Sequence, residues 1–226
     1  APKVKAAAEK QNIVLTCHAP YYINLNAADQ KKLEASKKRL VKAAEVAWLC
    51  GARSVAFHPG FYMGKSKEEA YAAVKKALSE VIQQLQNIGC SIWVRPETTG
   101  KRTQFGDLHE ILRLSQELEQ VMPCIDYAHL HAREGKCNSY EEFKEILMAI
   151  EKALGEEALE NMHIQVAGVN YSSSGELNHT NIKDSDLNYK EIVATWKELN
   201  IKGVVISESP NIEGDALLLK KLYERL

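Results

Sequence analysis

The sequence lacks several features that would place it in a specialised class of proteins. Its five cysteines are odd in number, widely scattered and without a C-x-x-C pair, which argues against a disulfide framework or a structural zinc knuckle. No apolar run approaches the roughly 20 residues of a membrane-spanning helix, and no signal-like segment opens the chain. Lys and Arg total 29 against 30 Asp and Glu, so the net charge of -1 gives no general attraction to nucleic acid. We therefore expect a cytoplasmic protein in which any DNA contact is a local basic patch.

The sequence does contain enough apolar material for one large core. Apolar residues make up 45% of the 226 residues, which predicts a single domain. Short β-branched runs alternate with longer stretches in which apolar residues recur every three to four positions. The predicted strands are Ile13–Cys17, Ser54–His58, Ser91–Pro96, Met122–Asp126, Met162–Val166 and Gly203–Ser207. The predicted helices are Lys31–Leu49, Lys67–Ile88, Gln104–Leu118, Tyr140–Leu154, Tyr189–Leu199 and Gly214–Leu226.

This alternation indicates an α/β protein with a parallel sheet covered by helices, either open and doubly wound or closed into a barrel. An imidazole or carboxylate stands at the carboxyl end of most predicted strands: His18, His58, Glu97, Asp126 and Glu208. Such groups converge on one point only if the strands form a ring, so we predict a TIM-type (β/α)8 barrel. Six units are readable where a barrel has eight, and we expect residues 1-226 to be one barrel domain lacking its first two βα units.

The polar residues near the strand ends have the chemistry of a catalytic metal site. They are His18, His58, Glu97, Asp126, His129, His163 and Glu208. Imidazoles and carboxylates without a thiolate suit Zn²⁺, Mn²⁺ or iron in sites that keep open positions. One histidine after a strand is more often structural, but the recurrence of the pattern favours metal binding. His163 stands at the beginning of its predicted strand, which we attribute to an error in the boundary.

Five motifs, in order along residues 13-212, resemble the endonuclease IV family, also called AP endonuclease family 2, of the xylose isomerase-like TIM barrel superfamily. They are His18-Ala19-Pro20-Tyr21-Tyr22-Ile23-Asn24-Leu25, His58-Pro59-Gly60, Glu97-Thr98-Thr99-Gly100-Lys101, Asp126-x-x-His129 and Glu208-Ser209-Pro210. The resemblance is that of a divergent, archaeal-type member. It implies an endonuclease that hydrolyses the phosphodiester 5′ to abasic sites in double-stranded DNA during base excision repair, with zinc-bound hydroxide as the nucleophile.

The resemblance also implies roles for individual residues and two or three Zn²⁺ ions, with Mn²⁺ as the alternative. His18, His58 and Glu97 would hold the first ion, and Glu97, Asp126, His163 and Glu208 the second. His129 and His179 would hold the third. Glu97 and Glu208 would be the catalytic residues, and Tyr21 and Tyr22 would contact the DNA. We expect a monomer, and the lack of a long apolar run predicts no association with membranes.

The chain departs from the family's pattern in two places. The family's His-x-Asn-Asp reads His163-Ile164-Gln165-Val166 here, and its Asp-x-His reads Leu177-Asn178-His179, without the aspartate. Either a nearby acidic residue replaces that ligand, or the third ion binds weakly or not at all. The candidates for replacement are Glu176, Asp184 and Asp186.

Two other functions compete with this interpretation. A sugar isomerase or epimerase of the xylose isomerase-like superfamily would hold a single divalent ion with Glu97, Asp126, His163 and Glu208. The additional imidazoles of His18, His58 and His129 argue against it, because a one-ion enzyme does not need them. The third class is a non-catalytic module that binds DNA or metal. Counting the bound ions distinguishes the isomerase from the nuclease.

Overall fold

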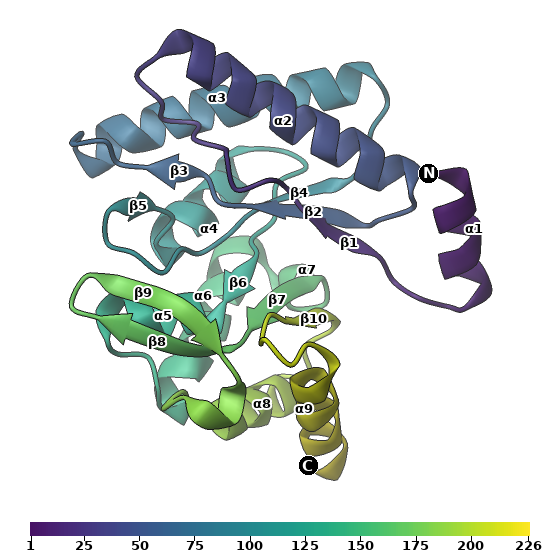
Figure 1. The fold of residues 1–226 in the computed structure, drawn as a ribbon, viewed down its shortest axis with the longest axis vertical. Helices are drawn as coiled ribbons and strands as arrows, with labels where there is room; N and C mark the ends of the chain where they lie inside the picture. The colour runs from purple at the N-terminus through teal and green to yellow at the C-terminus, as the bar shows by residue number, and fades with distance from the viewer. The chain divides into compact units, whose positions relative to one another are not determined.

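The computed structural model describes all of residues 1-226, which form two compact units (Figure 1). Unit 1 consists of Ala1–Glu97 and Thr103–Pro123, and unit 2 of Thr98–Arg102 and Cys124–Leu226. Each unit contains one three-stranded parallel sheet, so all six parallel strands expected from the sequence are present. None of the helices combines the length and the apolar composition needed to cross a membrane. The grouping of residues 1-226 into one barrel domain stays a prediction.

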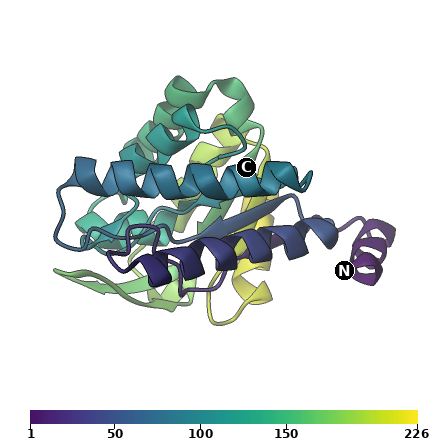
Figure 2. The same ribbon diagram turned by 90° about the horizontal axis from the view of Figure 1, so that it is seen from above.

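The sheet of unit 1 has the order β1-β2-β4. Its strands are β1 (Thr16–His18), β2 (Ser54–Phe57) and β4 (Trp93–Pro96). All four residues of β2 are buried, as expected for a central parallel strand. The helices α2 (Gln30–Leu49) and α3 (Lys67–Asn87) lie side by side along this sheet (Figures 1 and 2). The other elements of unit 1 are α1 (Pro2–Lys10), β3 (Gly60–Phe61), β5 (Gln104–Phe105) and α4 (Leu108–Glu117).

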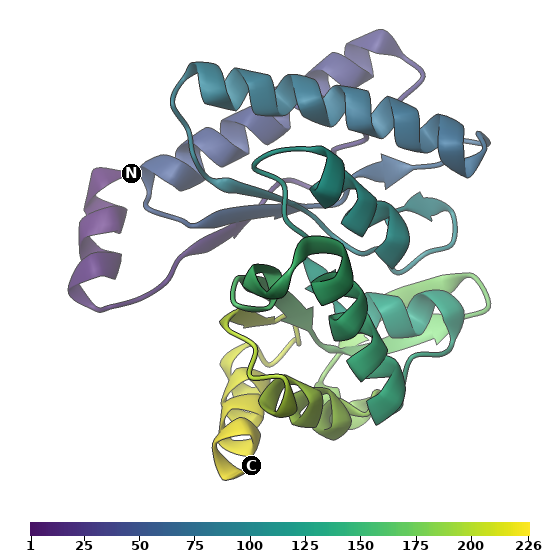
Figure 3. The ribbon, with the colours of Figure 1, turned by 180° about the vertical axis from the view of Figure 1, so that it is seen from behind.

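The sheet of unit 2 has the order β10-β7-β6. Its strands are β6 (Ile125–Asp126), β7 (Met162–Val166) and β10 (Gly203–Ser207). Three helices, of which α8 contacts the other two, are seen from behind in Figure 3: α6 (Tyr140–Leu154), α8 (Tyr189–Glu198) and α9 (Glu213–Arg225). The buried Trp196 indole donates a hydrogen bond to the Tyr127 hydroxyl at 3.3 Å, which satisfies both polar groups inside the core. The short elements α7 (Glu156–Leu159) and η1 (Ile182–Asp184) complete the unit.

A β-hairpin packs on a short helix within unit 2, and it matters for the site. The hairpin consists of β8 (Gly168–Ser172) and β9 (Gly175–Thr180), and the helix is α5 (Tyr127–Glu134). Ala128 and Ala132 lie one turn apart on α5 and pack with Ala167 and Val169 in a small buried cluster. Because these side chains are small, the backbone of the hairpin comes close to the helix.

The structure corrects three sequence predictions. The helix predicted at Gln104–Leu118 begins only at Leu108, because its first residues form β5 and the Asp107 side chain caps the helix. The first strand begins at Thr16 rather than Ile13, which is 57% exposed. The α5 helix and the β8–β9 hairpin were not expected, since their apolar residues are small and few.

Candidate metal sites

Unit 1 brings together three of the predicted ligands, His18, His58 and Glu97, which we call the unit 1 group. His18 ends β1, His58 follows β2 and Glu97 follows β4, so the ends of neighbouring parallel strands supply all three. The Nε2 atom of His18 lies 2.9 Å from Glu97 Oε2, and that of His58 lies 3.0 Å from Glu97 Oε1. The ligand atoms all lie within 4.8 Å of one another, and Glu97 is fully buried.

The contacts of the His18 ring fit those of a metal ligand. Its Nδ1 lies 2.7 Å from the Ala19 carbonyl oxygen, while Nε2 faces the Glu97 carboxylate. A neutral imidazole carries one N–H, so it cannot donate to both oxygens. An imidazolium would donate to both oxygens, whereas a proton on Nδ1 alone leaves the Nε2 lone pair free to bind a metal ion beside Glu97. A ligand histidine whose other nitrogen donates to a backbone carbonyl is the usual geometry of metal sites.

Motif residues that are not ligands hold the loops after β1 and β2 together. The backbone N–H of Leu25 donates to the Pro59 carbonyl oxygen at 2.9 Å. Gly60 has a φ of 137°, and a Cβ atom there would lie 2.3 Å from Asn24 Oδ1. Only glycine permits this conformation and this close approach. These contacts explain why the two histidine motifs contain more than their histidines.

Unit 2 brings together Asp126, His129 and His179, whose ligand atoms also lie within 4.8 Å of one another; with Glu176 they form the unit 2 group. Asp126 ends β6 and caps α5, because its Oδ1 accepts a hydrogen bond from the backbone N–H of His129 at 2.8 Å. Its Oδ2 is buried and has no hydrogen-bond partner. A buried carboxylate oxygen without a partner is costly, so this atom points to a bound cation.

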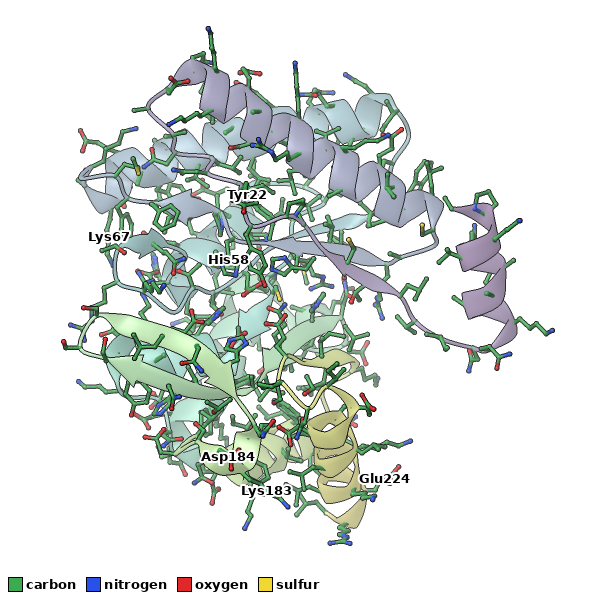
Figure 4. The ribbon with its side chains drawn as sticks, viewed as in Figure 1. Tyr22, His58, Lys67, Lys183, Asp184 and Glu224 are labelled. Atoms are coloured by element: carbon green, nitrogen blue, oxygen red, sulfur yellow. The ribbon has the colours of Figure 1, made fainter.

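Of the three acidic candidates Glu176, Asp184 and Asp186, Glu176 on β9 is the one that lies near His129 and His179. Its Oε2 lies 3.4 Å from His129 Nε2, and its Oε1 lies 3.8 Å from His179 Nε2. The hydrogen bond with His129 lowers the pKa of Glu176 to about 2. Asp184 lies on η1, where Figure 4 labels it, and accepts from Asn181. Asp186 accepts from the Tyr171 hydroxyl at 2.8 Å and lies 3.1 Å from His131 Nε2, so neither aspartate belongs to the group.

The structure places His163 outside both groups. It is the second residue of β7, and that strand begins at Met162 as predicted, so a boundary error does not explain its position. Gln165 is instead the residue of β7 in register with Asp126. Its Nε2 donates to Glu208 Oε1 at 2.6 Å. The other oxygen of Glu208 lies 3.9 Å from His179 Nδ1, which connects Glu208 to the unit 2 group.

Tyr21 and Tyr22 are exposed beside the unit 1 group, with 76% and 81% of their surface accessible. The Tyr21 ring meets His58 edge-on, with ring centroids 5.8 Å apart. Tyr22 and His58 are labelled in Figure 4, where both lie toward the end of the sheet away from α1. Exposed aromatic rings next to candidate metal ligands are well placed to contact a ligand, and their binding to DNA stays a prediction.

Imidazole and carboxylate groups that could hold a metal ion stand at the carboxyl ends of parallel strands, which is where TIM-barrel enzymes have their active sites. The chain belongs to the family described as Xylose isomerase-like TIM barrel, whose family model matches residues 1–224. This match confirms the predicted fold class and the resemblance to AP endonuclease family 2.

Two relatives extend this assignment. Uncharacterized protein MJ0133 of Methanocaldococcus jannaschii is 42% identical over 217 residues, which cover 96% of this chain and 79% of that protein. Probable endonuclease 4 of Bacillus subtilis is 26% identical over 213 residues, which cover 91% of this chain and 69% of that protein. The sequence relationship therefore includes proteins named as nucleases.

Two solved structures have the same fold. Endonuclease IV from Thermus thermophilus has a TM-score of 0.74 at 21% identity and covers 99% of this chain and 81% of its own. A D-tagatose 3-epimerase-like protein has a TM-score of 0.73 at 20% identity, and the match covers 100% of this chain and 82% of that protein. The two agree equally well, so the fold by itself does not choose between a nuclease and a sugar epimerase.

Proposed function

We propose that this protein is a metal-dependent endonuclease that hydrolyses the phosphodiester 5′ to abasic sites in DNA. One observation carries the proposal: the chain has two complete groups of metal-type ligands, one in each unit. A one-ion sugar isomerase needs only one such group, whereas nucleases commonly use two or more ions for in-line displacement. The sequence similarity to a probable endonuclease 4 supports the same conclusion.

His18, His58 and Glu97 would hold one ion, and Asp126, His129, Glu176, His179 and Glu208 would hold another. Zn²⁺ bound in such sites supplies a nucleophile at neutral pH and stabilises charge on the leaving oxygen. Glu97 offers its two oxygens to two different imidazoles, so one carboxylate orients both histidines.

Two further features of the chain support the proposed chemistry. The His129 Nδ1 donates to the Thr98 carbonyl oxygen at 2.9 Å, which directs Nε2 toward Glu176 and fixes the ring before any ion binds. We further propose that Tyr21 and Tyr22 pack against the DNA at the damaged nucleotide, where exposed rings can replace lost base stacking.

The direct test is a nicking assay on a duplex with one abasic site, using protein loaded with Zn²⁺. We expect cleavage of this duplex, no cleavage of the undamaged duplex, and loss of activity when a chelator removes the metal. Glu97→Gln should abolish nicking. Glu110→Gln is the matched control, because Glu110 is a second buried glutamate of unit 1 that binds the Tyr62 hydroxyl. If Glu97→Gln nicks within a few-fold of the native protein, the proposed role of Glu97 is wrong.

The second candidate is a sugar isomerase or epimerase, and it is favoured by the unit 2 group, which would suffice for a one-ion enzyme. Elemental analysis separates the two functions. Two or three ions per chain support the nuclease, whereas about one ion per chain together with isomerisation of a ketose supports the isomerase. Binding to DNA should also weaken steeply as salt rises, because phosphate contacts release counterions. A flat salt response contradicts the nuclease.

A further inference from the structure

Gln165 lies on β7 directly opposite Asp126, the predicted ligand on the neighbouring strand β6. The two residues are in register across the sheet, and Gln165 is only 2% exposed. Both ends of its amide are engaged. The Cys124 thiol donates to Gln165 Oε1 at 3.1 Å, and Gln165 Nε2 donates to Glu208 Oε1 at 2.6 Å.

These two contacts fix which way the amide points. The thiol supplies a donor on one side, and the Glu208 carboxylate supplies an acceptor on the other. Turning the amide over would set its carbonyl oxygen against the carboxylate, with two acceptors in contact. One of the two amide orientations is therefore strongly preferred.

In the preferred orientation, Gln165 holds the carboxylate of Glu208 and does not itself bind a metal ion. An amide can bind a cation only through its oxygen, and that oxygen faces Cys124. The N–H group bonds one oxygen of Glu208, while the other oxygen faces His179 in the unit 2 group. The hydrogen bond is charge-assisted, which makes it stronger than one between neutral groups.

We propose that Gln165 is a positioning residue that holds the Glu208 carboxylate in place for the metal ion of unit 2, and that Cys124 keeps the Gln165 amide in the orientation this requires. The inference rests on the proposed function, since it takes Glu208 as part of the metal-binding machinery.

The test compares Gln165→Met with Gln120→Met in the intact chain. Methionine keeps the volume of glutamine and removes its polar groups. Gln120 is the control, because its amide donates to the Cys90 and Ile92 carbonyl oxygens at 2.8 Å in unit 1. Zinc affinity is measured without DNA by competition with a chromophoric chelator, and Tm is measured on metal-free protein.

We expect Gln165→Met to weaken zinc binding about 10- to 100-fold, the usual effect of losing a group that orients a ligand. Nicking should lose kcat with little change in KM. Gln120→Met should leave zinc affinity and kcat unchanged. Native zinc affinity in a folded Gln165→Met protein overturns the inference and leaves the nuclease proposal standing. If the native chain binds zinc but never nicks, the nuclease proposal fails, and the zinc affinities still decide the role of Gln165.

A second pair of variants tests the orienting role of Cys124. Cys124→Ser keeps a donor for Gln165 Oε1 and should bind zinc as the native protein does. Cys124→Ala removes the donor and should weaken zinc binding several-fold, although Gln165 itself is intact. If Cys124→Ala lowers Tm but binds zinc with native affinity, Cys124 serves only the core, and its proposed orienting role is wrong.

Discussion

The ligand group of unit 1 rests on the ends of three neighbouring parallel strands, whereas that of unit 2 combines a strand end, a helix and a hairpin. In unit 1 the sheet alone sets the spacing of His18, His58 and Glu97. In unit 2, Asp126 ends β6, His129 lies on α5 and His179 lies on β9. The first group is fixed by strand pairing, and the second depends on how the hairpin packs on the helix.

This difference predicts that the two groups respond differently to mutation. Changes that leave the unit 1 sheet intact should leave its ligands in place. Zinc binding by the unit 2 group should be sensitive both to substitution of its ligands and to substitution of the side chains that pack between the hairpin and α5. The predictions below probe this contrast, beginning with the largest expected effect.

Glu97→Gln should lower nicking by more than about 100-fold, beyond the loss expected for a residue that only orients a ligand. Glu97 is the one carboxylate of the unit 1 group and contacts both of its histidines. Zinc content should fall by about one ion per chain, as measured by elemental analysis. Full zinc content in this variant would show that unit 1 holds no ion through Glu97.

Asp126→Asn should weaken zinc binding in unit 2 by about 100-fold without lowering the Tm of the metal-free protein. The asparagine oxygen can still accept the His129 N–H and cap α5, while the costly buried Oδ2 charge is removed. Chelator competition and thermal unfolding measure the two effects. A lower Tm with native zinc affinity would mean that Asp126 is structural.

The sequence was sufficient for the six parallel strands and for the grouping of His18, His58 and Glu97, because both depend on local pattern. Each strand appeared as a short apolar run, and each unit 1 ligand stood at the end of one. The position of His163 was misjudged because a histidine beside an apolar run does not reveal which end of the strand is at the site. Gln165 was identified only by its register with Asp126, a long-range pairing that no local pattern encodes.

Glu176 was one of three acidic candidates in the sequence, and only the hairpin distinguishes it. The pairing of β8 with β9 places Glu176 and His179 near His129, while Asp184 and Asp186 lie beyond the hairpin with other partners. The hairpin depends on small residues packed on α5, which give a weak hydrophobic signal.

Glu176→Gln should reduce the acid sensitivity of the metal-free protein. The folded-state pKa of about 2 lies below the ordinary value of 4.5, so the ionised carboxylate stabilises the fold above pH 4.5. That contribution is lost as pH falls from 4.5 toward 2. The native protein should therefore lose more Tm than the variant over this range. Parallel curves for the two proteins would contradict the ion pair of Glu176 with His129.

Ala128→Leu should have the smallest effect, a several-fold weaker zinc affinity in unit 2. The larger side chain would push the hairpin from α5 and cost about 1–3 kcal/mol by overpacking. Ala44→Leu on α2 is the control in unit 1, since Ala44 is also fully buried. Both variants should lose stability, but only Ala128→Leu should lose zinc affinity. Equal zinc affinities would show that the hairpin packing does not set the unit 2 group.

The most direct test of two separate ligand groups is the zinc content of two double variants, His18→Ala/His58→Ala and His129→Ala/His179→Ala. The native chain should hold at least two ions, and each double variant should lose the ion of its own unit while keeping that of the other. A native content of about one ion, removed completely by either double variant, would contradict the account.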